Sequence, residues 1–150
     1  MAKRERIEDS GQRIGKPALV SIITINYNQA EITRQFLESA KRLTYSNYEV
    51  IVVDNASIEP LSNYLDLSLY PLLRLIRSDV NLGFTGGNNL GIQEAKGDFF
   101  FIVNNDTELS PPLLDELLKP FIENKAVGVS CQKSGSSIPL NSFNMRATIQ

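Results

Sequence analysis

The stretch "ALVSIITINYN" (residues 18–28) decides the fold class of this chain. It is rich in β-branched residues over the length of one strand and then turns polar, which predicts a buried strand. After this strand, apolar residues recur at helical spacing, at Ile32, Phe36, Ala40 and Leu43. A helix is therefore expected over about 29–42, with Asn28 and Glu31 spaced as in a capping box at its start.

Strands and helices continue to alternate along the chain. Further strands are predicted at 48–55, 72–77, 98–103 and 126–131. The glycine-rich stretch "NLGFTGGNN" (81–89) predicts a loop that opens a short helix, which Gly97 can end. A last helix is predicted after Ser110 and Pro111, and Pro120 should kink or end it.

Buried strands that alternate with helices predict an α/β fold. We expect a mostly parallel, doubly wound, Rossmann-like sheet with helices on both faces, because each strand is apolar on both sides. Residues 1–17 are expected to form a flexible polar arm, 18–131 the folded part, and 132–150 an irregular tail or the start of a further half. In such sheets, ligands bind beyond the carboxyl ends of the strands.

The composition excludes several classes of function. With 15 basic and 17 acidic residues the chain carries a net charge of −2, so no overall positive field would recruit nucleic acid. It contains no histidine, which excludes serine–histidine catalysis and imidazole metal ligands, and its one cysteine, Cys131, excludes an intramolecular disulfide. No apolar stretch is long enough to span a membrane or to serve as a signal peptide, so a cytoplasmic location is expected.

Polar residues follow three of the predicted strands at the point where each strand ends. They are Asn26, Tyr27 and Asn28, then Asp54 and Asn55, and finally Asn104, Asn105 and Asp106. Each cluster alone also suits a helix cap or a turn. Together, at one edge of a parallel sheet, they indicate a binding site. A carboxylate there can hold Mg²⁺ or Mn²⁺, which completes its shell with water and phosphate oxygens.

The glycine-rich stretch adds weaker support for a ligand site. Glycines let a backbone approach a ligand closely, and the helix that follows offers its positive end to phosphate oxygens. The stretch matches neither the dinucleotide-binding pattern nor the Walker pattern, and a simple flexible turn before a helix stays open as an interpretation.

Four segments, in this order, carry a family resemblance: "VSIITINYNQ", "EVIVVDNAS", "NLGFTGGNNLGI" and "FFFIVNNDTEL". They resemble the family 2 glycosyltransferases of the GT-A fold, and especially the rhamnosyltransferase-like branch, over about residues 18 to 131. The resemblance implies a metal-dependent enzyme of polysaccharide biosynthesis. It would bind a nucleoside-diphosphate sugar, dTDP- or UDP-linked, and transfer the sugar with inversion to a glycan or lipid-linked acceptor. Peripheral association with a membrane is compatible with such an acceptor.

The same resemblance implies roles for single residues. Tyr27 would pack against the nucleotide base, with Asn28 in the same segment. Asp54 would bind the edge of the base, and Ser57 would close the turn that follows. Residues of the segment after the third strand would line the donor site: Asn81, Gly86 and Asn88.

The motif after the fourth strand is usually Asp-X-Asp in this family. Asp106 occupies the position of the last aspartate, which coordinates the metal under the diphosphate. Asn104 and Asn105 stand where the family contacts the donor. Asn104 replaces the first aspartate, and since an amide is a weaker ion ligand, this departure bears on metal affinity more than on donor binding.

The resemblance also implies a general base, a carboxylate in the later half of the domain that takes the proton of the acceptor hydroxyl. Residues 126–150 contain no Asp or Glu, so no catalytic residue is assigned. The chain is expected to be an N-terminal fragment that binds the donor without activating the acceptor. Two other functions stay open: a non-catalytic nucleotide-binding remnant, and a nucleotidyltransferase, which also uses a metal-bound diphosphate.

Overall fold

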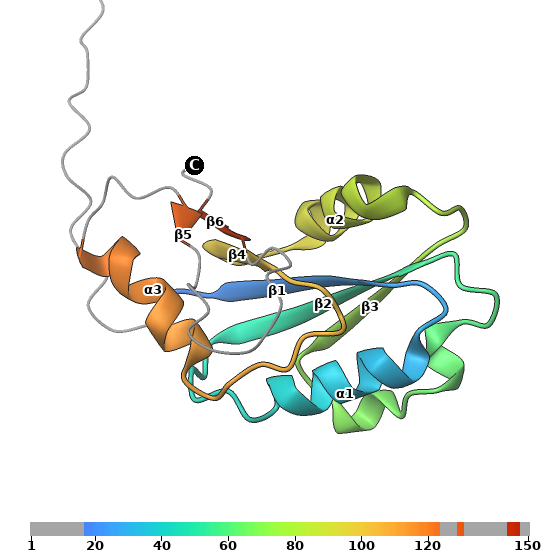
Figure 1. Cartoon of the computed structure of the whole chain (residues 1–150), viewed down its shortest axis with the longest axis horizontal. Coiled ribbons are helices and arrows are strands. Elements are labelled where there is room, and N and C mark those ends of the chain that lie inside the picture. Colours follow the sequence, from blue (N-terminus) through green and yellow to red (C-terminus); the bar gives the residue numbers. More distant parts are fainter. Residues whose placement is uncertain (1–16, 124–128, 131–143, 148–150) are drawn as a thin grey trace, which may run out of the picture.

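The computed structural model describes residues 17–123, 129–130 and 144–147. Its centre is a six-stranded sheet in the order β3-β2-β1-β4-β6-β5 (Figure 1). The strands are β1 (Val20–Asn26), β2 (Tyr48–Asn55), β3 (Leu73–Ser78), β4 (Phe99–Ile102), β5 (Val129–Ser130) and β6 (Asn144–Ala147). β1 pairs in parallel with β2 and β4, and β2 pairs in parallel with β3, whereas β6 lies antiparallel to β4 and β5.

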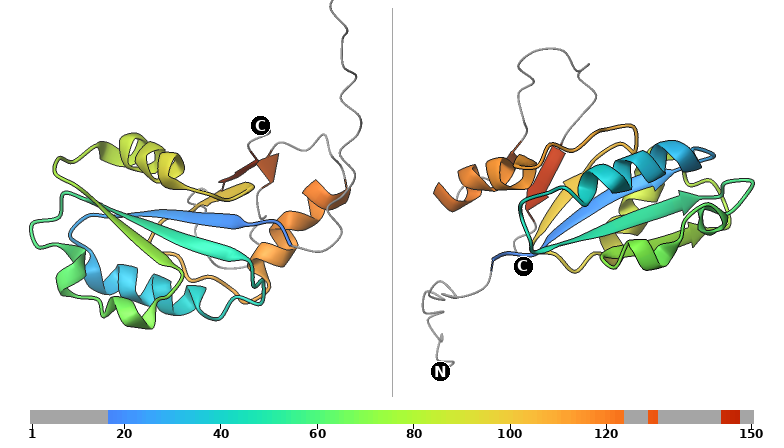
Figure 2. Two further views of the ribbon diagram at one scale, coloured as in Figure 1. Left: turned by 180° about the vertical axis from the view of Figure 1, so that it is seen from behind. Right: turned by 90° about the horizontal axis from the view of Figure 1, so that it is seen from below.

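Helices cover both faces of this sheet. Within the described ranges they are α1 (Ala30–Ala40), α2 (Gly83–Glu94) and α3 (Leu113–Glu123), with short 3-10 turns η1 (Leu61–Asn63) and η2 (Leu67–Leu69). α2 lies on one face and α1 on the other (Figures 1 and 2), and α3 shares a core cluster with α1. The predicted α/β architecture, a mostly parallel sheet with helices on both faces, is confirmed.

Alternation of side chains along β1 builds a core on each face of the sheet. Ile22 belongs to the cluster that includes Phe36 and Leu37 of α1. Ile23 points the other way and packs with Ile51 and Val53 beneath α2. Burying each of these side chains contributes about 1.5–3 kcal/mol relative to leaving it exposed. The two cores hold the strands in place, so that the polar residues at their carboxyl ends are fixed.

The segment 81–89 is mostly helix, although its glycines predict a loop, because α2 begins at Gly83. Close packing on the sheet explains why glycines occur in this helix. A Cβ atom on Gly91 would lie 2.5 Å from Cγ2 of Ile23, closer than two carbon atoms can approach. The helix ends at Glu94, before Gly97, which was predicted to end it.

Pro120 does not end α3, because the helix continues through it to Glu123. A proline inside a helix removes one backbone hydrogen bond. Apolar packing on both sides of Pro120 offsets that loss. Leu117 is buried, and the ring of Phe121 lies 5.0 Å from the ring of Phe99 in β4, measured between centroids.

Strand positions agree well with the prediction in the first two thirds of the chain, and β2 has the predicted bounds. Of the predicted strand at 126–131, only Val129–Ser130 is described. β6 lies within 132–150, where an irregular tail or the start of a further half is predicted. Most of the predicted arm, and Cys131, lie outside the described residues. None of the described helices combines the length and the apolar character needed to cross a membrane.

Candidate functional site

The ends of three neighbouring strands form the first part of the site. Asn26 of β1 lies in register with Asp54 of β2, and Asp54 lies in register with Arg77 of β3. Residues in register on parallel strands point to the same face of a sheet. The three side chains therefore stand in a row at the carboxyl edge, on the face that α1 covers.

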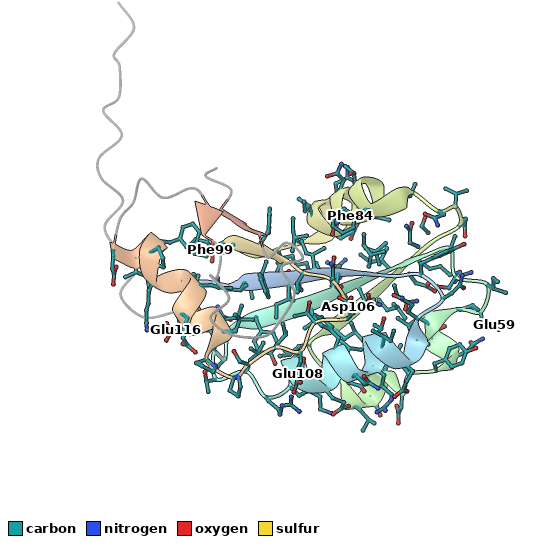
Figure 3. All side chains as sticks on the ribbon, in the orientation of Figure 1. Glu59, Phe84, Phe99, Asp106, Glu108 and Glu116 are labelled. Carbon is teal, nitrogen blue, oxygen red and sulfur yellow. The ribbon has the colours of Figure 1, made fainter. Side chains whose placement is uncertain are left out.

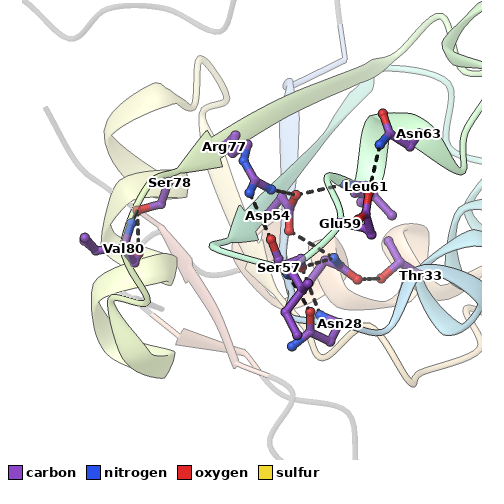
Figure 4. A network of polar contacts seen from close by, with 12 residues as sticks. Asn28, Thr33, Asp54, Ser57, Glu59, Leu61, Asn63, Arg77, Ser78 and Val80 are labelled. Carbon is purple, nitrogen blue, oxygen red and sulfur yellow. Dashed lines mark hydrogen bonds and ion pairs between the residues drawn. The ribbon is translucent and has the colours of Figure 1, made fainter.

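Asp54 is the centre of this row (Figure 4) and is only 1% exposed. Its Oδ2 accepts hydrogen bonds from Nη1 of Arg77 (2.7 Å) and from the backbone N–H of Leu61 (2.9 Å), and its Oδ1 accepts one from Nδ2 of Asn26 (3.2 Å). Burial alone would raise the pKa of Asp54, but hydrogen bonds from Ser57, Leu61, Asn26 and Arg77 outweigh it and lower the pKa below its ordinary value. Asp54 is therefore ionised, and protein donors already occupy both of its oxygens.

Asn28 and Ser57 join the loops that follow β1 and β2. The hydroxyl oxygen of Ser57 accepts hydrogen bonds from the backbone N–H of Asn28 (2.9 Å) and from Asn26 (3.0 Å). In return, Oδ1 of Asn28 accepts from the backbone N–H of Ile58 (2.8 Å). Asn28 has a φ of 55°, a left-handed conformation that asparagine tolerates better than most residues. The side chain of Asn28 does not cap α1, so the capping-box prediction is wrong. Asn28 and Ser57 instead hold the two loops in place.

A cavity of about 330 Å³ lies beside these loops. Its walls come from the loop after β1, the end of β2, the start of α2 and the segment after β4, and they include Tyr27, Asn55, Asn88 and Asn104. Tyr27 is 47% exposed and Phe84, on α2 (Figure 3), is 62% exposed. Two exposed aromatic rings and several amides in one cavity suit a flat polar ligand with an aromatic ring.

Asn55 anchors the start of α2 at the wall of this cavity. Its Oδ1 accepts from the backbone N–H of Leu82 (2.9 Å), and its Nδ2 donates to Oδ1 of Asn81 (3.0 Å). Asn88 also lines the cavity, and its Nδ2 donates to the carbonyl oxygen of Phe84 (3.0 Å). Gly86 is not part of the wall. Of the three residues predicted from this segment, Asn81 and Asn88 thus face the cavity.

The turn after β4 carries the predicted metal-binding residue. Asn104 and Asn105 both line the cavity, and Asn105, which is only 8% exposed, donates from Nδ2 to Oγ1 of Thr33 (2.9 Å) and to Oε1 of Gln29 (3.2 Å). Asp106, labelled in Figure 3, is exposed. Within the described part of the chain its carboxylate makes no hydrogen bond or ion pair. It borders a second hollow of about 330 Å³ alongside α1.

An exposed carboxylate without a protein partner fits the role of a ligand to a hard divalent cation. Among the described residues, no group of three or more acidic or thiol side chains could hold a metal by itself. An ion at Asp106 would therefore complete its shell with water and with oxygens of the ligand, as Mg²⁺ commonly does with phosphates.

The structure brings in two residues that the sequence did not single out for the site, Thr33 on α1 and Arg77. Asn26, which the sequence does place at the end of the first strand, connects Thr33 to Asp54. A signal for Arg77 exists in the sequence, because it stands near the end of the predicted third strand. The carboxyl end of that strand faces the same edge as the other two.

The chain is similar in sequence and in fold to known proteins. The family model described as "Glycosyl transferase family 2" matches residues 21–148. An uncharacterized glycosyltransferase of Bacillus subtilis (strain 168), YwdF, is 30% identical over 132 residues, which cover 81% of this chain and 47% of the relative. The putative colanic acid biosynthesis glycosyl transferase WcaA of Escherichia coli (strain K12) is 30% identical over 102 residues, or 67% of this chain and 37% of the relative.

Among solved structures, the mannosyltransferase PcManGT from Pyrobaculum calidifontis, in complex with GDP-Man and Mn²⁺, superimposes with a TM-score of 0.70 at 25% identity. The match covers 77% of this chain and 35% of that one. The chain thus spans about half the length, or less, of the curated relatives it matches. On the match of the family model, which covers most of its length, the chain belongs to glycosyl transferase family 2 and has the GT-A type of fold.

Proposed function

We propose that this chain is the donor-binding part of an inverting glycosyltransferase that takes a sugar from dTDP or UDP and serves a glycan or lipid-linked acceptor. One observation carries the proposal. A cavity lined by an exposed tyrosine and several amides includes Asn104 and Asn105 of the turn that presents the free carboxylate of Asp106, and it lies at the carboxyl edge of the sheet, where Asp54 and Arg77 also pair.

Different residues in and near the cavity can bind different parts of a nucleoside diphosphate. The half-exposed ring of Tyr27 offers a face on which a base can stack. Arg77 is 39% exposed and can donate to the base edge while it keeps its bond to Asp54. The amides of Asn88 and Asn104 can exchange hydrogen bonds with ribose hydroxyls.

Asp106 is the residue that would hold the metal ion beneath the diphosphate. A bound Mg²⁺ or Mn²⁺ would neutralise the negative charge that develops on the leaving diphosphate. Asn104 stands two residues before it and, as a neutral amide, leaves Asp106 as the main protein ligand. The mannosyltransferase with GDP-Man and Mn²⁺ supports a divalent ion at such a site.

The specific donor, the rhamnosyltransferase-like specificity, the choice between Mg²⁺ and Mn²⁺ and the cytoplasmic location are parts of the same proposal. The donor, the specificity and the metal follow from the sequence resemblance, and the cytoplasmic location is the expectation drawn from the apolar stretches in the sequence. The relative named for colanic acid biosynthesis supports a place in polysaccharide synthesis.

Thermal denaturation with nucleotides and metals tests the proposal. UDP or dTDP together with Mn²⁺ is expected to raise the melting temperature of the chain, with GDP as the nucleotide control. Asp106→Ala should remove the part of the shift that needs the metal and keep the part that does not. A folded sample whose melting temperature no nucleotide changes would contradict the proposal.

A further inference from the structure

A continuous chain of buried hydrogen bonds connects the two ends of the proposed donor site. Nδ2 of Asn105 donates to Oγ1 of Thr33 (2.9 Å), and Oγ1 of Thr33 donates to Oδ1 of Asn26 (2.8 Å). Nδ2 of Asn26 then donates to Oδ1 of Asp54 (3.2 Å). All four residues are buried, and Figure 4 shows the part from Thr33 to Asp54. We call Asn105, Thr33, Asn26 and Asp54 the polar relay.

Every hydrogen bond in the polar relay points toward the carboxylate. The hydroxyl of Thr33 has one proton, which it donates to Asn26, so it can only accept from Asn105. Asn26 uses its carbonyl oxygen toward Thr33 and its amide nitrogen toward Asp54 and Ser57. Hydrogen bonds aligned in this way polarise one another, and in a buried site they are stronger than in water. The charge state and partners of Asp54 therefore affect the bond that holds Asn105.

Asn105 precedes Asp106 in the same turn, and its buried side chain fixes the turn against α1. Asp106 itself has no described partner that would orient it. The position of the backbone from which its carboxylate projects is consequently held through Asn105, and Thr33 and Gln29 are the groups that hold Asn105.

We propose that Thr33 is a positioning residue that couples recognition of the nucleoside at Arg77, which is paired with the buried Asp54, to the placement of Asp106. The inference rests on the proposed function. Thr33 lines neither hollow and acts only through its two hydrogen-bond partners. Because coupling between two sites is reciprocal, a bound nucleoside should favour metal and diphosphate at Asp106, and these should favour the nucleoside equally.

Binding to the 150-residue chain tests the coupling, with Thr33→Val as the variant and Thr33→Ser as its matched control. Valine keeps the shape of threonine but cannot form the relay, whereas serine keeps the hydroxyl. Calorimetry would measure the Kd of UDP and dTDP with and without Mn²⁺, and of uridine and thymidine alone. In Thr33→Val the gain in affinity that Mn²⁺ gives should fall by about 5-fold or more, the size of a typical coupling. Nucleoside affinity should change by less than about 2-fold, and Thr33→Ser should restore the gain.

A second measurement can contradict the inference without a stable Thr33 variant. In a nitrogen-edited NMR spectrum, the side-chain amide signal of Asn105, assigned by its loss in Asn105→Ala, should move when uridine or thymidine is added without metal. Neither nucleoside carries a phosphate that could reach Asp106, but a nucleoside in the cavity can touch Asn105 directly, because Asn105 lines it. A moving signal therefore supports the polar relay only if Thr33→Val abolishes the movement and Thr33→Ser keeps it, whereas a signal that stays still contradicts the relay without any Thr33 variant.

The outcomes separate the two ideas. If UDP and dTDP fail to bind the folded chain, both the proposed function and this inference are wrong. If they bind, but the Asn105 signal stays still on addition of nucleoside, only the inference is wrong. The same holds if Thr33→Val keeps the full gain from Mn²⁺, because a purely structural Thr33 would lower stability and leave that gain unchanged.

Discussion

Arg77 and Asp54 form an ion pair of 2.7 Å in which the carboxylate is buried and the guanidinium reaches solvent. Arg77 also donates from Nη2 to the carbonyl oxygen of Ser57 (2.9 Å), so it holds the loop as well as the charge. The pair combines two roles. It neutralises a buried carboxylate, and it presents a cationic donor at the edge where the donor site is proposed.

Removing Arg77 should destabilise the fold, because it leaves Asp54 buried without its cation. We expect Arg77→Ala to lower the free energy of unfolding by about 1–3 kcal/mol, less than for a fully buried pair because the arginine is partly exposed. Arg74→Ala is a matched control on the same strand, since its pair with Glu94 is exposed on both sides and should contribute about 1 kcal/mol or less. Urea denaturation measures both, and equal losses would contradict the special role of Arg77.

Acid should weaken the fold partly through Asp54. Its pKa is lower in the folded chain than the ordinary 3.8, so its contribution is complete above that value and is lost as the pH falls through the lower, folded pKa. Asp54→Asn should reduce stability at neutral pH. Below about pH 4 the stability of this variant should also fall less steeply than that of the natural chain. Urea midpoints measured from neutral pH downward test this, and parallel curves would count against it.

Ala56 has a φ of 63°, a conformation that costs an L-residue with a side chain but not a glycine. We expect Ala56→Gly to raise the free energy of unfolding by about 0.5–1 kcal/mol, after allowing for the greater freedom of glycine in the unfolded chain. Ala95→Gly is the control, because Ala95 has an ordinary φ of −72°. The free energy of unfolding of Ala95→Gly should fall by about as much as that of Ala56→Gly rises. A loss of stability in both variants would show that the strain at Ala56 is negligible.

Gly91→Ala should push α2 away from the sheet, since the added Cβ would lie 2.5 Å from Cγ2 of Ile23 and 3.4 Å from Cγ2 of Val53. Overpacking of this kind costs about 1–3 kcal/mol. Because the first turns of α2 carry walls of the cavity, nucleotide binding should weaken as well. Gly83→Asn serves as a control for stability: the space around Gly83 is open, and asparagine tolerates its φ of 68°. Because Gly83 also lines the cavity, the two variants are compared by chemical denaturation only, and calorimetry compares nucleotide binding by Gly91→Ala with that by the unchanged chain.

The sequence predicts the strands well and the helices less well, for a physical reason. β2 was placed at its observed bounds because an uninterrupted apolar run is a local signal. The start of α2 was missed because Gly83 to Gly91 weaken any local preference for a helix, while the packing of Gly91 on Ile23 is visible only in three dimensions. That α3 continues past Pro120 is equally hard to see in the sequence, since the contact between Phe99 and Phe121 joins residues far apart in the chain.

The residues of the site also divide into those that a local signal in the sequence reveals and those that only the three-dimensional fold reveals. Asp54 and Asp106 could be singled out because each stands where an apolar run turns polar, Asp54 near the carboxyl end of β2 and Asp106 in the turn after β4. The position of Arg77 near the end of the third strand is visible in the sequence, but its pairing with Asp54 is not, since that becomes apparent only when β3 is set in register with β2. Thr33 needed even more information, because its place in the polar relay depends on how α1 is rotated over the sheet.

Neighbouring residues Asp54 and Asn55 serve opposite faces of β2: the carboxylate meets Arg77 beneath α1, and the amide ties down Leu82 at the start of α2. A strand that slips by one residue exchanges the faces of all its side chains. Such a slip in β2 would bring a negative charge to the start of α2 and leave Arg77 facing a neutral amide. The chemistry of this edge thus depends on the register of the strands as much as on the identity of their residues. Deleting one residue within β2, ahead of Asp54, would move the carboxylate and the amide each to the opposite face of the sheet without removing either side chain.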